Sequence, residues 1–459
     1  NLGVRYEYNG PFVETGNQIA NLDVNFNPQS VIGYLVLPGQ SGPYYGHYPD
    51  SLVRPSRNDW APRIGIAWKP MKDTVVRTGY GINYDLSQYS TFVHDFAFQP
   101  PFAVTQTNAV ADVQSPATSP LTLGNGFPST TSEITNNYGL NPNYRLGYVQ
   151  IWNIDIQRQL PDNIQLNVGY NGAKGTHLDT QRALIPSCSI PVPETCAANE
   201  VAAPFIYDSS EGDSILNAGT VRIRKRMSKG LAVNGVFVFS KSIDDASSIG
   251  GGSAVVVQNP FDLAAERALS TFDQKFSFTG NWIYDLPFGD SRRFLNKGAI
   301  SHVLGGWQWS GSFTIASGLY YTPRVLGATE DINRGVSGSI RANVVEGQPF
   351  TVANPTTKQW FNTAAFCITG KTNCAGPSIY GDAGRDIIGG PSQFTFNSAI
   401  NKTITIRESR SLELRLQASN IFNTPYFSSI NTVVNSITYG QVTGVSGMRR
   451  ITMIVRFRF

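Results

Sequence analysis

The charged residues that recur at a regular spacing are the best candidates for binding a solute. Eleven of them alternate with apolar residues in extended segments. Side chains two positions apart point to the same face of a β-strand, so this spacing places the charges on polar faces. They are Arg63, Lys69, Arg77, Arg222, Arg224, Arg226, Asp285, Glu413, Arg415, Arg456 and Arg458. Such a basic surface can attract anionic solutes or hold another domain by ion pairs. The alternative is that the charges only keep an enclosed interior hydrated.

Four cysteines form two pairs that are close in sequence, Cys188 with Cys196 and Cys367 with Cys374. Each pair lies in a stretch rich in Gly, Pro, Ser and Thr, and neither has the ligand spacing of a zinc site. We expect two local disulfides in exposed loops, and therefore an oxidising compartment. Four free buried thiols are the alternative.

Catalytic motifs are absent from the sequence. It lacks Gly-x-Ser-x-Gly, P-loop, His-Glu-x-x-His and Cys-x-x-Cys patterns, and its four histidines are scattered. Three acidic pairs can hold a divalent cation in a loop, although we favour solvated loop acids; they are Asp244 with Asp245, Glu330 with Asp331, and Asp382 with Asp386. We therefore expect no enzyme activity, no catalytic residues, no metal site and no cofactor.

Alternation of apolar and polar residues is the dominant pattern along the chain. Trp152, Ile154 and Ile156, for example, are separated by polar residues. This period of two predicts β-strands with one apolar and one polar face. The twelve segments that show it are 1–8, 62–70, 74–85, 146–160, 164–176, 213–226, 231–243, 273–286, 304–318, 392–406, 411–423 and 449–459.

The connections between these segments alternate between short and long. The short ones are 71–73, 161–163, 227–230 and 407–410, with one of medium length at 287–303. The long ones are 9–61, 86–145, 177–212, 244–272, 319–391 and 424–448. Such alternation is typical of bacterial outer-membrane barrels. We therefore predict that residues 1–459 are a single all-β region, a transmembrane antiparallel β-barrel, with the polar strand faces toward its lumen. The long loops are expected to be extracellular, and both chain ends periplasmic. A soluble β-protein is the alternative.

Composition excludes several other classes of protein. Charged residues make up 15% of the chain and aromatic residues 12%, and the formal net charge is +4. No run approaches the ~18 apolar residues of a membrane-spanning helix. The many aromatic residues and the small net charge disfavour a disordered chain and a strongly basic nucleic-acid-binding protein.

The last residues of the chain carry the most specific local signal. Five apolar residues alternate in phase up to a terminal phenylalanine, namely Ile451, Met453, Val455, Phe457 and Phe459. This pattern resembles the outer-membrane insertion signal that the barrel-assembly machinery reads by strand addition. We therefore expect that machinery and outer-membrane lipid to be partners of the chain.

Several longer sequence segments resemble the barrels of TonB-dependent outer-membrane transporters. The resemblance is in particular to the Oar-like branch of carboxypeptidase-regulatory-like-domain-containing proteins. These segments include DWAPRIGIAWKP from Asp59, VVRTGYGINYD from Val75, GYVQIWNIDIQRQLPDNIQLNVGYNGAKGTHL from Gly147, GDAGRDIIGGPS from Gly381 and LRLQASNIFNTPYF from Leu414. The resemblance implies a 22-stranded barrel preceded by a signal peptide, a TonB box and a plug. This chain shows none of those N-terminal parts, so we expect it to be the C-terminal half of such a barrel. Contact with the TonB system would then require the missing N-terminal region.

The expected function is therefore the barrel part of a TonB-dependent receptor that takes up an unidentified substrate across the outer membrane of a Gram-negative bacterium. The alternatives are a stand-alone outer-membrane pore or surface-binding scaffold, and a secreted all-β adhesion protein. Aromatic residues in the long loops can stack on sugars or peptides, although aromatic residues near a membrane interface are expected in any case. The candidates for ligand contact are Tyr44, Tyr45, Trp60, Trp360 and Tyr380.

Overall fold

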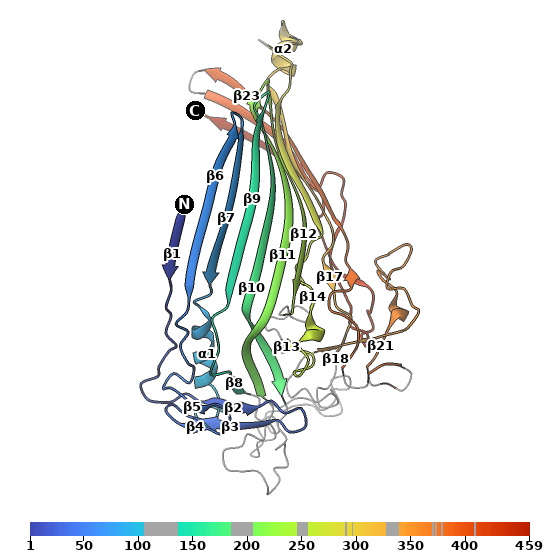
Figure 1. Ribbon diagram of the computed structural model, residues 1–459. Helices are drawn as coiled ribbons and strands as arrows, with labels where there is room; N and C mark the ends of the chain where they lie inside the picture. The colour runs from blue at the N-terminus through green and yellow to red at the C-terminus, as the bar shows by residue number, and fades with distance from the viewer. Residues whose placement is uncertain are drawn as a thin grey trace.

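The computed structural model describes residues 1–104, 136–184, 205–245, 256–289, 292–295, 297–326, 339–369, 371, 374–377, 380–407 and 410–459. Twelve strands follow one another in chain order across a single antiparallel sheet (Figure 1). They are β1 (Leu2–Tyr6), β6 (Trp60–Met71), β7 (Thr74–Tyr84), β9 (Tyr148–Leu160), β10 (Ile164–Leu184), β11 (Phe205–Ser228), β12 (Leu231–Asp244), β15 (Phe276–Asp285), β16 (Trp307–Ala316), β23 (Gln393–Arg407), β24 (Arg410–Ser419) and β27 (Arg450–Arg458). Each lies within or overlaps one of the twelve alternating segments, so the predicted antiparallel strand arrangement is confirmed.

The strand pairing gives the sheet one apolar and one polar face. One row of paired positions crosses nine strands and is apolar throughout. It runs through Trp68, Val76, Ile156, Val168, Val221, Phe237, Phe278, Ile315 and Phe394. The adjacent row on the other face includes Arg77, Asp155 and Thr220. Because neighbouring residues of a strand point to opposite faces, this register separates an apolar surface from a polar one.

Short turns join the strands at one end of the sheet. Between β9 and β10, Asp162 and Asn163 both have a positive φ, and Lys229 and Gly230 do so between β11 and β12. Two successive residues of positive φ are typical of the tight hairpin turn that suits twisted strands. The connection between β15 and β16 contains α2 (Ala299–Leu304), which lies at this same end (Figure 1). The long connections gather at the opposite end.

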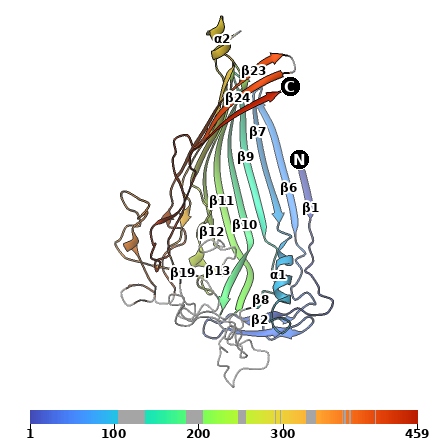
Figure 2. The same ribbon diagram turned by 180° about the vertical axis from the view of Figure 1, so that it is seen from behind.

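The sheet is open within the described residues. There, β1 pairs with β6 alone and β27 pairs with β24 alone. The strands nearest the C-terminus, β23, β24 and β27, cross the end of the sheet at a steep angle to β6, β7 and β9, as both views show (Figure 2). The two edge strands therefore retain one side of backbone groups that can pair with further strands.

Two strands extend well beyond the alternating segments 164–176 and 213–226. After shifts in register at Gly175 and Leu178, β10 and β11 continue to pair as far as Leu184 with Phe205. The sequence did not predict this extension, because polar and apolar residues stop alternating there. The added residues are held by packing instead, since Leu184 and Phe205 are buried in one cluster with Leu22 of β2.

Shorter elements build a packed layer from the long connections. They are β2 (Asn21–Asn25), β3 (Ile32–Val36), β4 (Ser41–Gly42), β5 (Gly46–His47), α1 (Gln88–Ala97), β8 (Asn137–Leu140), β13 (Val256–Val257), β14 (Ala268–Leu269), β17 (Tyr320–Tyr321), β18 (Arg324–Leu326), β19 (Ser339–Arg341), β20 (Asn343–Val344), β21 (Phe366–Cys367), β22 (Ile388–Gly389), β25 (Tyr426–Ile430), β26 (Val442–Ser446) and the 3-10 turns Ala264–Glu266 and Thr363–Ala365. Across the described residues, the helices are too short or too polar to span a membrane.

This loop layer has its own hydrophobic cores. In one, Tyr89, Phe92 and Phe96 of α1 pack with Tyr48 and Tyr144, which come from two other parts of the chain. A second core gathers apolar residues of the connection between β16 and β23 around Phe361 and Phe366 and reaches Ile430 of β25. The layer is therefore a folded surface and not a set of independent loops.

Candidate functional site

The polar face of the sheet carries the predicted charges. Register pairs place Arg77 opposite Asp155, Arg222 opposite Asn167 and Arg224 opposite Gln165, all on the face away from the apolar row. The same pairing puts Asp285 in line with Gln308, and Gln308 in line with Asn401 and Arg415. Lys69 and Arg226 lie next to short turns, where the pairing shifts. The remaining predicted charges follow the same alternation on β6, β24 and β27, namely Arg63, Glu413, Arg456 and Arg458.

Some of these charged side chains form hydrogen bonds or ion pairs with neighbouring side chains. Arg63 donates to Asn83 at 2.8 Å and Arg77 donates to Gln157 at 2.7 Å. The carboxylate of Glu413 lies 3.6 Å from the guanidinium groups of both Arg456 and Arg458. Asp285 accepts a hydrogen bond from Gln308 at 2.9 Å and lies 3.5 Å from Arg292.

Four guanidinium groups on the same face are different. Within the described part of the chain, the side chains of Arg222, Arg224, Arg226 and Arg415 have no ion-pair or hydrogen-bond partner, and all four are exposed. A cavity of about 660 Å³ is lined by Arg224, Arg226 and Arg415. Arg222 lines a smaller one of about 360 Å³ together with Arg77 and Asp155. The sequence placed these arginines on polar faces, but only strand register shows which of them remain unpaired.

At the end with the long connections, a buried ion-pair network joins two of the loops. Arg385 donates to Asp244 at 2.6 Å, and Arg341 donates to Glu266 at 2.9 Å. Glu266 also lies 3.9 Å from Arg385, so one carboxylate connects both guanidinium groups. All four side chains are almost completely buried. Paired and hydrogen-bonded charges tolerate such burial, whereas single ones do not.

Gln258 extends this network through the backbone. Its backbone N–H donates to Glu266, and its side-chain amide donates to the carbonyl of Gly381 at 2.9 Å. The backbone N–H of Arg341 in turn donates to the Gln258 side chain at 2.6 Å. The connections between β12 and β15 and between β16 and β23 are therefore held together by charged and neutral hydrogen bonds.

The interpretation of Asp244 and Asp386 as solvated loop acids is wrong, whereas Asp382 is exposed, as that interpretation expects. Asp244 is buried in its pair with Arg385, and Asp382 accepts a hydrogen bond from the backbone of Val344 at 2.7 Å. Asp386 is buried beside Thr322, whose hydroxyl donates to it at 3.1 Å. Burial raises the pKa of Asp386 to about 6, although Arg385 acts in the opposite direction. Asp244 and Asp386 are structural because partners distant in sequence cover them. Asp245, next to Asp244, is half-buried and accepts a hydrogen bond from the backbone of Asp213. Glu330 and Asp331 lie outside the described residues.

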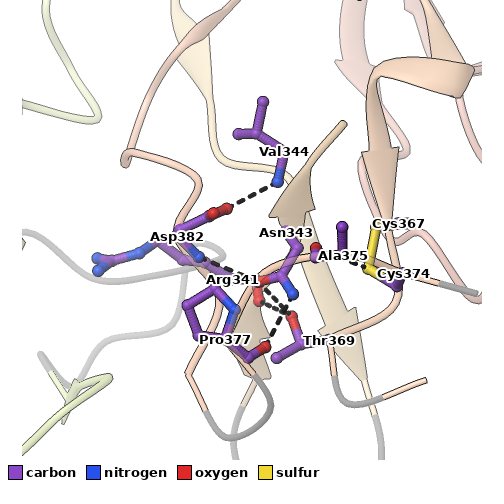
Figure 3. Close-up of a disulfide and its surroundings, with 9 residues drawn as sticks. All are labelled: Arg341, Asn343, Val344, Cys367, Thr369, Cys374, Ala375, Pro377 and Asp382. Atoms are coloured by element: carbon purple, nitrogen blue, oxygen red, sulfur yellow. Dashed lines mark hydrogen bonds between the residues drawn. A yellow bond between two sulfur atoms is a disulfide. The ribbon is translucent and has the colours of Figure 1, made fainter. Parts of the chain in front are cut away.

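One predicted disulfide is present in the structure. Cys367 and Cys374 are bonded, with their Cα atoms 5.6 Å apart, beside β20 and β21 (Figure 3). Asn343 lies next to it, donating to the carbonyl of Pro377 at 2.8 Å, while Thr369 donates to the carbonyl of Arg341 at 3.0 Å. The other predicted pair, Cys188 and Cys196, lies outside the described residues.

The aromatic residues proposed as ligand contacts do not gather at one site: Trp60 begins the sheet strand β6, whereas the others lie in the long connections. The ring of Trp60 lies within 6 Å of the ring of Tyr6, and the ring of Tyr44 lies within 6 Å of the ring of Tyr34. The indole N–H of Trp360 donates to the carbonyl of Gly389 at 3.0 Å, and its ring contacts Phe427. The backbone N–H of Tyr45 donates to Asp23 at 3.1 Å, and Tyr380 is half-buried. The ring contacts of Trp60, Tyr44 and Trp360 give these three side chains a structural role.

A further cavity, of about 510 Å³, was not predicted from the sequence. It lies where β7, β9 and β10 meet the loop layer, and its walls include Tyr84, Tyr148, His177, Asp85 and Asp179. The rings of Tyr84 and Tyr148 are 5.4 Å apart, and His177 is 5.9 Å from Tyr148. Aromatic faces beside carboxylates suit a ligand with both apolar and hydrogen-bonding groups. The signal in the sequence is weak because the residues come from three strands.

The apolar residues at the C-terminus lie on the apolar face of the edge strand β27. Ile451, Met453, Val455 and Phe457 are paired with Ala418, Leu416, Leu414 and Leu412 of β24. All four are more than half exposed, and so is Phe459. The structure therefore presents the predicted insertion signal on an accessible strand edge.

No group of three or more His, Cys, Asp or Glu side chains is placed to hold a metal ion among the residues that the structure describes. The unpaired arginines of the polar face and the aromatic cavity at the loop layer are described groups that can interact with a ligand.

Several solved structures are similar to this chain. The structure is similar to the outer membrane transporter YddB from Escherichia coli, with a TM-score of 0.49 and 9% identity, over 96% of this chain and 43% of that one. It is also similar to the ferripyoverdine receptor of Pseudomonas aeruginosa, with a TM-score of 0.42 and 8% identity, over 94% and 35% of the two chains. For the siderophore receptor PirA from Acinetobacter baumannii the TM-score is 0.41 and the identity 10%, over 95% and 45%.

The chain thus spans less than half the length of each of these three proteins. No curated protein matches it significantly in sequence. The family model of the outer membrane beta barrel domain, in contrast, matches residues 1–452, which is nearly the whole chain, and the protein therefore belongs to the outer membrane beta barrel family.

Proposed function

We propose that the chain is the barrel part of a TonB-dependent receptor or transporter that takes up a solute across the outer membrane. The observation that carries this proposal is the two-faced sheet with a folded layer of long connections at one end only. An apolar row across nine strands suits lipid, and a polar face with unpaired arginines suits a water-filled path. The sequence segments, beginning at Asp59 and ending with the one from Leu414, that resemble TonB-dependent barrels support this class of transporter.

The place of the chain within a larger barrel, its orientation in the membrane and its partners are proposed from the same family resemblance. The chain is the C-terminal portion of an Oar-like barrel, and coupling to TonB depends on a region N-terminal to it. The long connections are extracellular, whereas the short turns and both chain ends are periplasmic. The barrel-assembly machinery recognises β27, whose apolar residues are accessible. The protein binds and conducts its substrate and does not transform it chemically.

Site-directed labelling tests the orientation. Ile437 lies in the long connection between β24 and β27 and is fully exposed, whereas Asp73 lies in the short turn between β6 and β7 and is also exposed. In intact cells, a membrane-impermeant maleimide is expected to label an Ile437→Cys variant and not an Asp73→Cys variant. Both variants should be labelled after lysis. Labelling of Asp73→Cys alone in intact cells would contradict the orientation.

Capture on TonB tests the coupling. The complete gene product, extracted from the outer membrane in detergent, is expected to be retained by the immobilised periplasmic domain of TonB. Retention equal to that of an unrelated outer-membrane barrel would contradict TonB dependence. Steady conductance in planar bilayers in the absence of TonB would favour the alternative, a stand-alone pore.

A further inference from the structure

Three unpaired arginines line one cavity on the polar face. This cavity, of about 660 Å³, is bounded by β11, β12, β15, β16, β23 and β24, where the last two strands cross the end of the sheet (Figure 2). Arg224 and Arg226 reach it from β11, and Arg415 reaches it from β24. Within the described residues, none of these three guanidinium groups has an ion-pair or hydrogen-bond partner.

The charge of this cavity is not neutralised locally. None of the described residues that line it is an aspartate or a glutamate. Glu413 lies two residues from Arg415, but its carboxylate faces Arg456 and Arg458. In the smaller cavity on the same face, by comparison, Arg77 and Arg222 share the lining with Asp155. The excess of positive charge is therefore greater in the larger cavity.

Neutral hydrogen-bonding groups surround the arginines. Register pairs align one polar row across the cavity, made of Arg224, Asn234, Asn281, Ser312 and Asn397 on five successive strands. Within it, the amide of Asn397 donates to the hydroxyl of Ser312 at 3.1 Å. Amide and hydroxyl groups can donate to an anion beside a guanidinium without competing with it for charge. The row therefore extends the binding capacity of the cavity beyond its charges.

The geometry points to an oxyanion as the ligand. A guanidinium group presents a planar set of donors that matches two oxygens of a carboxylate or phosphate. Three such groups around one cavity favour a ligand with more than one anionic group. We propose that this cavity binds a polyvalent oxyanion, a small solute that carries two or more carboxylate or phosphate groups. This proposal rests on the proposed function in one respect, since it names the substrate class that the barrel would conduct.

Calorimetry on the complete gene product in detergent tests the proposal, with citrate and tripolyphosphate as probes at low ionic strength. We expect saturable binding of at least one probe, and the stronger probe identifies the carboxylate or phosphate class. Binding should weaken as salt is added, because exposed charges are screened. Removing two guanidinium groups in the variant Arg224→Gln/Arg415→Gln should weaken binding by about 100-fold, given that charge-assisted hydrogen bonds contribute more than neutral ones.

A matched variant separates this site from general attraction to a basic protein. Arg145 and Arg158 are exposed and unpaired through their side chains in the described structure, and neither lines the cavity. The variant Arg145→Gln/Arg158→Gln loses the same net charge and should bind the probe as tightly as the wild type. An equal loss in both double variants, or unchanged binding in Arg224→Gln/Arg415→Gln, would overturn the site.

Absence of binding to the wild type would also overturn it. This is the result expected if an acidic segment of the protein itself fills the cavity. The outcome is independent of transport, because calorimetry requires neither TonB nor an energised membrane. Binding without TonB capture would leave the anion site in place and contradict the proposed function, and TonB capture without binding would do the reverse.

Discussion

Arg385 donates two hydrogen bonds to Asp244, one to its carboxylate at 2.6 Å and one to its backbone carbonyl at 2.7 Å, across 141 positions of sequence. Asp244 is the last residue of β12, and Arg385 lies in the connection between β16 and β23. Through Glu266, the same guanidinium group is linked to Arg341. The end of one strand and two long connections are thereby fixed as one unit of the loop layer.

Loss of Arg385 should loosen this unit. An Arg385→Leu variant leaves Asp244 without its charged partner in a buried site, which typically costs about 3–5 kcal/mol. Hydrogen exchange should accelerate in residues 256–269 and 380–391, while the sheet keeps its protection. The control is Arg292→Leu, since Arg292 is exposed and lies 3.5 Å from Asp285, and such pairs contribute about 0–1 kcal/mol. Equal exchange in wild type and Arg385→Leu would contradict the role of the network.

Acidification should stabilise the same unit through Asp386. Its pKa is raised to about 6 by burial, above its ordinary value of 3.8, so the folded state binds a proton more readily than the unfolded state. The contribution of Asp386 to stability should therefore be highest below pH 4, fall as the pH rises from about 4 to about 6, and stay constant above. Hydrogen exchange across this pH range, corrected for intrinsic rates, measures the effect.

An Asp386→Asn variant isolates that carboxyl group from other titrating groups. Asparagine keeps the oxygen that accepts a hydrogen bond from Thr322 but carries no charge. The variant should be more stable than wild type at pH 7 and should lose the part of the pH dependence between about pH 4 and pH 6. The same profile in both proteins would show that Asp386 does not cause it.

The disulfide between Cys367 and Cys374 should stabilise its own part of the loop layer. Replacing both residues by serine restores freedom to a short loop in the unfolded state, at a cost of about 2–3 kcal/mol. We expect faster hydrogen exchange in β20 and β21. A reducing agent should reproduce this change in wild type and have no local effect in the double variant. Unchanged exchange would indicate that packing alone holds the segment.

Adjacent residues on β15 should differ sharply in their tolerance of charge. Phe278 belongs to the apolar row, and Thr279 lies on the polar face. If the apolar row faces lipid, Phe278→Arg should destabilise the barrel by about 2–4 kcal/mol near the membrane centre. Thr279→Arg, one residue away, should be accepted. The amount of each variant in the outer-membrane fraction measures the difference, and equal amounts would contradict the assignment of faces.

The alternation of residue types was sufficient to predict the twelve strands of the main sheet and their faces, apart from the extensions of β10 and β11. Ile154 and Ile156 had to share one face and Asp155 the other, because the period of a strand is two whatever its neighbours are. The same rule placed Arg222 and Arg224 on the polar face. The order of these strands along the chain and the alternation of short and long connections between them also followed from local sequence patterns.

Only the tertiary structure decided which of these groups are paired and which are free. Arg63 reaches Asn83 and Arg456 reaches Glu413 because of the register between strands, whereas Arg224 meets no partner in the described structure. The burial of Asp244 depends on a residue 141 positions away, which no local pattern specifies. Strand faces arise from neighbours in sequence, but charge pairing and loop packing arise from contacts between distant segments, and those exist only once the sheet has formed.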